Sequence, residues 1–125
     1  TNFSVIFPDT RNPRLLSVRA RITPVYSAEL LLAALSACMI KGIERVIPIL
    51  KFELRGVEVH VHGVRQDVPP RLESISYEIT VDTDEPDRRL ALLHENVKKY
   101  GTVFNTVAPG TELSGLLRRK ETGNP

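Results

Sequence analysis

The apolar run Ser27–Ile47 contains the only cysteine of the chain, Cys38, and constrains the fold more than any other stretch. Ser27 is a favourable N-cap, and Glu29 places a negative charge in the first turn, where the helix dipole favours it. Residues 30–40 are rich in leucine and alanine and offer no polar face, because only a serine and the cysteine among them are not plainly apolar. A helix that is apolar on every side is buried on every side, so the run predicts a central helix packed under a sheet.

Two further features concern the packing and the end of this predicted helix. Ala34, Cys38 and Gly42 are spaced four residues apart and form a stripe of small side chains, which lets another backbone come close. We expect that backbone to be either a strand of the same chain or the same helix of a second subunit. Pro48 removes a backbone hydrogen bond, so a kink or an end is expected near Ile47.

Length and composition are those of one soluble domain, which we expect to span residues 1–125. Of these residues 42% are hydrophobic and 26% charged, and the net charge of +2 is too small to favour a nucleic acid or a membrane as partner. Charged residues interrupt the apolar run before the roughly 20 residues that a membrane span needs. A single cysteine excludes an intrachain disulfide and indicates a reducing, cytoplasmic location.

The rest of the chain shows alternating patterns typical of strands and spacings of three and four typical of helices. Strands are expected at residues 3–7, 16–22, 57–62, 74–82 and 111–118, a further helix at residues 84–100, and a short turn or helix at residues 102–107. The first two strands are expected to pair as a hairpin, and a stiff loop containing Pro69 and Pro70 is expected at residues 66–71. The order ββαββααβ predicts an α+β fold in which helices pack on one side of an antiparallel sheet.

Cys38 is the only strong nucleophile that the sequence offers, in its thiolate form. Two interpretations stay open: a buried cysteine packs as a small hydrophobe, whereas a cysteine beside cations reacts. Lys41 lies one turn along the predicted helix, and Arg19 and Arg21 of the second predicted strand are further cations that would stabilise a thiolate if the sheet brought them near.

The histidines are weaker candidates. His60 and His62 share a strand face with Glu58, which suggests a metal pair, but no further ligands are apparent and a solvated polar face is the favoured interpretation. His94 lies in a charged stretch and is expected at the surface. No glycine-rich phosphate loop and no nucleophile elbow occurs, so neither a metal nor a cofactor is expected.

Three segments resemble a known family, that of the osmotically inducible protein C and the organic hydroperoxide resistance proteins (OsmC/Ohr). Ser27–Cys38 is similar to the helix that leads into the reactive cysteine of that family. Leu54–Val59 continues the likeness, and Lys99–Val107 resembles the segment around the family's second cysteine. The resemblance runs from about Ser27 to Arg119 in the family's order.

This resemblance implies a compact α+β fold that forms an intertwined homodimer, with two central helices packed together and active sites at the subunit interface. Members that reduce peroxides during oxidative stress use a first cysteine, which attacks the O–O bond and becomes a sulfenic acid. A second cysteine then closes a disulfide, which a dithiol such as a lipoyl group reopens. An arginine and a glutamate hold the site and favour the thiolate.

Only Cys38 carries over cleanly from this family pattern. The second cysteine falls on Gly101, so no internal disulfide forms and the catalytic set is incomplete. The family glutamate falls on Ala28, and its neighbour Glu29 is the candidate for that role. The family arginine has several candidates, of which Arg19 is our choice: Arg11, Arg14, Arg19 and Arg21.

Two functions follow from these observations. The first is a thiol-dependent peroxidase that reduces organic hydroperoxides with Cys38 and an external resolving thiol. The second is a homodimer without peroxidase activity that binds a small apolar ligand at the subunit interface. A cation close to an accessible Cys38 favours the first, and a buried Cys38 with no cation within about 6 Å favours the second.

Overall fold

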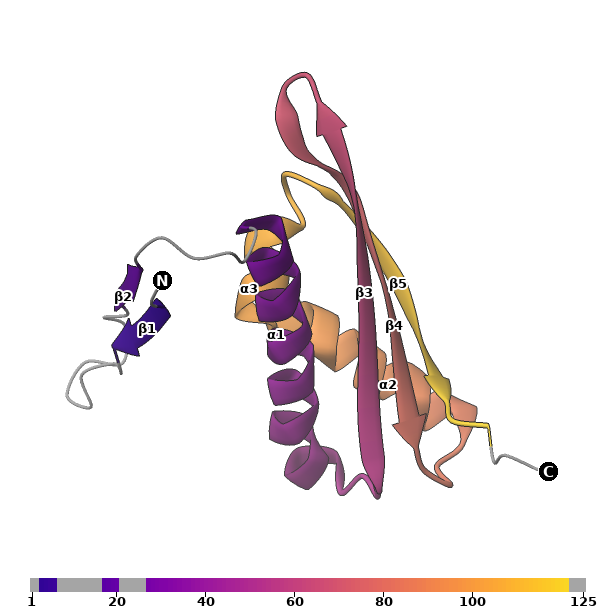
Figure 1. Cartoon of the computed structure of the whole chain (residues 1–125). Helices are drawn as coiled ribbons and strands as arrows, with labels where there is room; N and C mark the ends of the chain where they lie inside the picture. Colours follow the sequence, from indigo (N-terminus) through magenta and orange to yellow (C-terminus); the bar gives the residue numbers. More distant parts are fainter. Residues whose placement is uncertain (1–2, 7–16, 21–26, 122–125) are drawn as a thin grey trace. The chain divides into compact units, whose positions relative to one another are not determined.

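The computed structural model describes residues 3–6, 17–20 and 27–121 of the chain, which divides into two compact units, Thr1–Leu30 and Leu31–Pro125 (Figure 1). In the first unit, β1 (Phe3–Ile6) pairs antiparallel with β2 (Ser17–Ala20). The predicted hairpin is therefore confirmed, while residues 7, 16, 21 and 22 of the two predicted strands lie outside the described residues. The expected single domain over residues 1–125 stays a prediction.

The elements of the second unit follow in the predicted order. They are α1 (Ser27–Leu50), which begins at the end of the first unit, β3 (Gly56–Asp67), β4 (Pro70–Asp82), α2 (Asp87–Tyr100), α3 (Thr102–Val107) and β5 (Glu112–Arg119). The order ββαββααβ is thus confirmed. None of the helices within the described ranges has the length and apolar character that a membrane crossing requires.

The three-stranded sheet has the order β3-β4-β5 and is mixed rather than antiparallel. β3 and β4 are antiparallel, as expected, but β5 runs parallel to β4, with Tyr77 opposite Gly115. The prediction of a wholly antiparallel sheet is therefore wrong. The reason is the connection, because α2 and α3 carry the chain from the end of β4 back to the end where β4 began.

The predicted loop at residues 66–71 is also wrong. β3 continues to Asp67 and β4 begins at Pro70, so that only Val68 and Pro69 remain as a tight turn. Both prolines are compatible with this arrangement, because Pro69 lies in the turn and Pro70 is the first residue of β4.

The core lies between α1, α2 and one face of the sheet. Residues of α1 that recur at helical spacing are fully buried, and β4 supplies every second residue from Ile75 to Val81, as the alternation predicted. The central helix packed under a sheet is confirmed by this buried cluster: Leu35, Met39, Ile43, Val46, Phe52, Ile75, Tyr77, Ile79, Val81, Leu90, Leu93 and Val97.

α1 is nevertheless not buried on every side within one chain. Ala33, Ala34 and Ala37 are exposed, Leu31 is 39% exposed, and Ile49 is 67% exposed. The prediction of complete burial is wrong for the single chain, because its sheet and α2 cover only one side of the helix.

A kink or an end was expected near Ile47, and α1 does not end there but three residues later, at Leu50. α1 continues to Leu50 with Pro48 in its last turn, so the proline removes one backbone hydrogen bond there but only two helical residues follow it. Lys51 then takes a left-handed conformation with φ of 51°, and the amide of Phe52 donates to the carbonyl of Ile47 at 3.0 Å. This left-handed residue ends the helix.

Candidate active site

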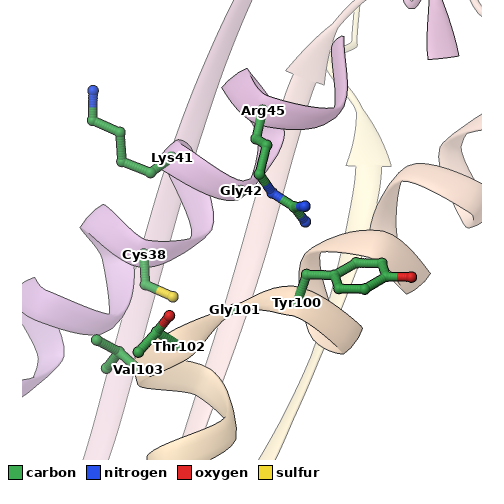
Figure 2. Close-up of a pocket in the computed structure, with 8 residues that line it drawn as sticks. All are labelled: Cys38, Lys41, Gly42, Arg45, Tyr100, Gly101, Thr102 and Val103. Carbon is green, nitrogen blue, oxygen red and sulfur yellow. The ribbon is translucent and has the colours of Figure 1, made fainter. Parts of the chain in front are cut away.

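One face of α1 opens onto a cleft of about 300 Å³ at the junction between α2 and α3. The residues that α1 contributes are spaced three and four apart, so they lie on one stripe of the helix. The lining residues are Cys38, Lys41, Gly42 and Arg45 from α1, and Tyr100, Gly101, Thr102 and Val103 from the junction (Figure 2). Cys38 is partly exposed and its thiol is free.

Gly101 brings the chain against the sulfur of Cys38. A Cβ atom at position 101 would lie 3.1 Å from Sγ of Cys38, 3.0 Å from Cβ of Phe104 and 3.0 Å from the carbonyl oxygen of Val97. Gly101 is buried and links α2 directly to α3, so a residue without a side chain is what lets the two helices join so close to Cys38.

The stripe of Ala34, Cys38 and Gly42 packs against α2 of the same chain. The two expected partners were a strand of the same chain and the same helix of a second subunit. A Cβ atom on Gly42 would lie 3.8 Å from Val97, and Cys38 faces the end of α2 at Gly101. Ala34 remains exposed in the single chain. The predicted close approach of another backbone is thus found at two of the three positions, with a helix of the same chain as the partner.

Arg45 places a guanidinium group in the cleft. Its Cζ atom lies 4.8 Å from the centroid of the Tyr100 ring, a cation–π distance, and its side chain points toward Tyr100 in Figure 2. Lys41 points away from the sulfur and pairs with Glu44 at 3.0 Å. Sequence reasoning missed Arg45, although its position seven residues after Cys38 puts both on one face of a helix.

The family described as OsmC-like protein matches residues 25–114, a span that includes the whole cleft. The chain belongs to this family. The resemblance inferred from the segments around Cys38, Gly56 and Gly101 is therefore confirmed. No curated protein matches the chain.

Solved structures share the fold of this OsmC-like protein. An OsmC-like protein from Mycoplasma pneumoniae is 13% identical with a TM-score of 0.70, over 95% of this chain and 94% of that one. The organic hydroperoxide resistance protein OhrB of Bacillus subtilis is 12% identical with a TM-score of 0.62, over 94% and 98%. A Psychrobacter arcticus protein named for osmotic stress and detoxification is 18% identical with a TM-score of 0.66, and the match covers 73% of this chain and only 66% of that one. At such identities the likeness shows the fold alone.

Two predicted site residues of this OsmC-like protein are not placed at the cleft by the described residues. Glu29 is exposed in the first turn of α1. Arg19 lies in β2, in the first unit, and its side chain is outside the described part of the chain. The roles proposed for both residues stay predictions.

The histidines on β3 lie on the solvated face of the sheet, opposite the core. His60 and Glu58 are exposed, with His60 Nε2 3.3 Å from a carboxylate oxygen of Glu58. Within residues 3–6, 17–20 and 27–121 there is no group of three or more potential ligands that could hold a metal ion.

The expectation that His94 lies at the surface is wrong. His94 is half-buried on α2, and its Nε2 atom forms a 2.6 Å hydrogen bond with the hydroxyl of the buried Tyr77. Burial lowers the pKa of His94, with Lys98 acting in the same direction, while burial raises the pKa of Tyr77 to about 12. The sequence prediction placed His94 at the surface because its neighbours in the sequence are charged. His94 nevertheless lies one helical turn after the buried Leu90, on the side of α2 that faces the core.

Proposed function

We propose that this OsmC-like protein reduces organic hydroperoxides with Cys38 and relies on an external thiol to complete the cycle. The observation that supports this most is that the free sulfur of Cys38 lies at an open cleft that also contains a guanidinium group. Relatives of the same fold include a protein named for organic hydroperoxide resistance. A protective role in the cytoplasm under oxidative stress belongs to the same proposal, since a thiol cycle needs a reducing compartment.

The proposed cycle balances as follows. The Cys38 thiolate attacks one peroxide oxygen, the O–O bond breaks, and the other oxygen leaves as an alcohol after taking a proton. Sulfur loses two electrons and becomes a sulfenic acid, and the peroxide gains them. A first external thiol then displaces water and forms a mixed disulfide, and a second thiol releases a symmetrical disulfide and restores Cys38.

The need for an external thiol follows from Gly101. The position nearest the sulfur of Cys38 on the facing segment carries no side chain, and the sequence contains no other cysteine. A sulfenic acid at Cys38 is therefore not resolved within one chain, and the proposed cycle takes its resolving thiol from another molecule.

The test of this function is stoichiometric oxidation of Cys38 by cumene hydroperoxide. We expect one equivalent of peroxide to convert the wild-type thiol to a sulfenic acid that dimedone traps at Cys38, as located by mass spectrometry. Cys38→Ser is expected to lose all labelling and all peroxide consumption. Labelling no faster than that of a free cysteine in a denatured control would contradict the proposal.

The alternative function, binding of a small apolar ligand at a subunit interface, is supported by the exposed apolar residues of α1. It becomes the better explanation if Cys38 reacts like a free cysteine and if apolar compounds raise the melting temperature of the wild-type protein in proportion to their concentration.

We also propose that the protein is a homodimer whose subunits meet at the exposed side of α1. Three exposed alanines and Leu31 form an apolar helix face that the sheet and the other helices of the second unit leave uncovered, and such a face is typical of an interface between subunits.

Ala37→Glu is expected to convert the dimer to a monomer, because it places one charge per subunit, and two at the symmetric contact, on this face. Sedimentation velocity is the measurement, with twice the mass of one chain expected for the wild type. Ala91→Glu, on an exposed position of α2, is the matched control and should remain dimeric. A monomeric wild-type protein would refute this contact.

A further inference from the structure

We infer that the external thiol which resolves oxidised Cys38 carries a carboxylate, and that Arg45 binds this carboxylate. The inference rests on the proposed function, because the thiol acts in the second half of the proposed cycle. It gives Arg45 a role in selecting the thiol, and the resemblance to the family assigned no role to this residue. It follows from the position, the charge and the spacing of Arg45 relative to Cys38.

The guanidinium of Arg45 is held in the cleft by an aromatic ring. Its Cζ atom lies 4.8 Å from the centroid of the Tyr100 ring, and the two side chains approach each other across the cleft from α1 and from the end of α2 (Figure 2). Stacking on an aromatic ring leaves the edge of the guanidinium, with its N–H donors, free to bind a carboxylate through two hydrogen bonds. Arg45 is thus a pre-positioned anion receptor.

The charges around the cleft are positive where a ligand would enter. Lys99 also lies near Tyr100, with Nζ 5.3 Å from the ring centroid. Glu44, the acidic residue next to Arg45 in the sequence, pairs with Lys41 at 3.0 Å. Among the side chains that the structure describes, no carboxylate forms an ion pair with Arg45. The cleft lining contains two basic residues and no acidic one.

The spacing of the two groups defines the kind of thiol. Arg45 is seven positions after Cys38, so the Cα atoms of the two residues are offset by about 10 Å along the axis of α1, and both side chains line the same cleft. A thiol with a flexible spacer of several atoms can therefore reach the sulfur of Cys38 while its carboxylate contacts Arg45. The cleft of about 300 Å³ is at the lower end of the range of small-molecule pockets, about 300–1,000 Å³, and is therefore large enough for a small thiol.

Gly101 explains why the thiol, more than the peroxide, needs this recognition. An internal cysteine would be held beside the sulfenic acid at all times, whereas an external thiol must be gathered from solution and oriented. In the step itself, the carboxylate-bearing thiol attacks the sulfur of the sulfenic acid, the S–O bond breaks, and water leaves with the thiol proton. A second molecule of the same thiol then releases the symmetrical disulfide and restores the Cys38 thiol.

The experiment compares 6-mercaptohexanoate with 6-mercaptohexanol as resolving thiols, because they differ in charge but not in the surroundings of their sulfur. For the wild type we expect the anionic thiol to react with the Cys38 sulfenic acid about 5-fold faster, a preference that shrinks as salt is added. Arg45→Gln should bring this ratio close to one. Arg88→Gln removes an exposed arginine of α2 outside the cleft and should keep the wild-type ratio.

A second measurement separates this inference from the peroxidase proposal. The symmetrical disulfides of the same two thiols exchange with reduced Cys38 and form the same mixed disulfides without any sulfenic acid. The same charge preference and the same loss in Arg45→Gln are expected, even if Cys38 reacts poorly with peroxides. Equal rates for both disulfides in the wild type, or an unchanged ratio in Arg45→Gln, would overturn the inference. If Arg45→Gln slows only the reaction of Cys38 with a carboxylate-bearing hydroperoxide, then Arg45 binds the peroxide and not the thiol. That result would also overturn the inference.

Discussion

Gly101→Cys is expected to form a disulfide with Cys38 when the protein is oxidised. A Cβ atom at position 101 would lie 3.1 Å from Sγ of Cys38. In a disulfide the Cβ atom of one cysteine lies about 3 Å from the sulfur of the other, as an S–S bond of about 2.05 Å requires. The new side chain therefore starts close to bonding geometry, and the variant should resolve a sulfenic acid at Cys38 without an external thiol.

Intact mass under non-reducing conditions, after oxidation with diamide and separately with cumene hydroperoxide, measures this bond as the loss of two hydrogen atoms and of both free thiols. The bond should also raise the free energy of unfolding of the oxidised variant by about 4 kcal/mol over its reduced form. Gly42→Cys is the matched control, because cysteines one turn apart on a helix have Cβ atoms about 5–6 Å apart, too far for a disulfide. Two free thiols in oxidised Gly101→Cys would contradict the geometry of the cleft.

Gly115→Ala is expected to destabilise the fold by about 2 kcal/mol, the cost of overpacking a core position. A Cβ atom at position 115 would lie 2.5 Å from three carbon atoms of the Tyr77 ring. The ring has little room to move, because its hydroxyl bonds His94 at 2.6 Å and its edges meet the rings of His94 and Phe104. The parallel pairing of β4 with β5 therefore depends on a glycine at this position.

Thermal and urea unfolding measure this cost, and a melting temperature lower by roughly 8 °C is expected for a chain of this size. Gly110→Ala is the matched control, since a Cβ atom there would have no neighbour within 4 Å, and its effect should stay within about 0.5 kcal/mol. In a Tyr77→Leu background the cost of Gly115→Ala should shrink, because the flat ring is gone. An equal cost in both backgrounds would show that the ring is not the cause.

The elements that the sequence predicted well are those whose patterns are local. The alternation around Ile75 and Val81 reflects a strand with one buried face, and the spacing of Leu90, Leu93 and Val97 reflects a helix on the same core. Both patterns depend only on which residues of one element face the interior. They can therefore be recognised without knowledge of the rest of the fold.

The features that were missed depend on contacts between distant segments. The direction of β5 follows from the path of α2 and α3, and a single sequence carries no signal for strand direction at that range. Pro48 was expected to kink or end α1 near Ile47, but the helix continues to Leu50 and ends at the left-handed residue Lys51. The exposed apolar side of α1 was expected to be buried, because composition does not tell which chain covers a helix.

The candidate site was predicted in part. Cys38 and the position of Gly101 came from motif likeness, and the cleft brings the two together. Arg45 and Tyr100 come together only because α2 ends against α1, which no spacing in the sequence shows. Glu29 and Arg19 stay predictions.

The glycine beside the sulfur of Cys38 also has a genetic consequence. Two of the four glycine codons become cysteine codons by a single base change, and the backbone at position 101 already runs past Cys38. One point mutation at this position is therefore enough to supply a cysteine beside Cys38, and with it a route from dependence on cellular thiols to resolution within the chain. A side chain at position 101 also meets Cβ of Phe104 and the carbonyl oxygen of Val97 at 3.0 Å, so the exchange needs a small local shift where α2 joins α3. Such a shift is smaller than a change of fold, so the reducing partner of such a protein is expected to change faster in evolution than its architecture.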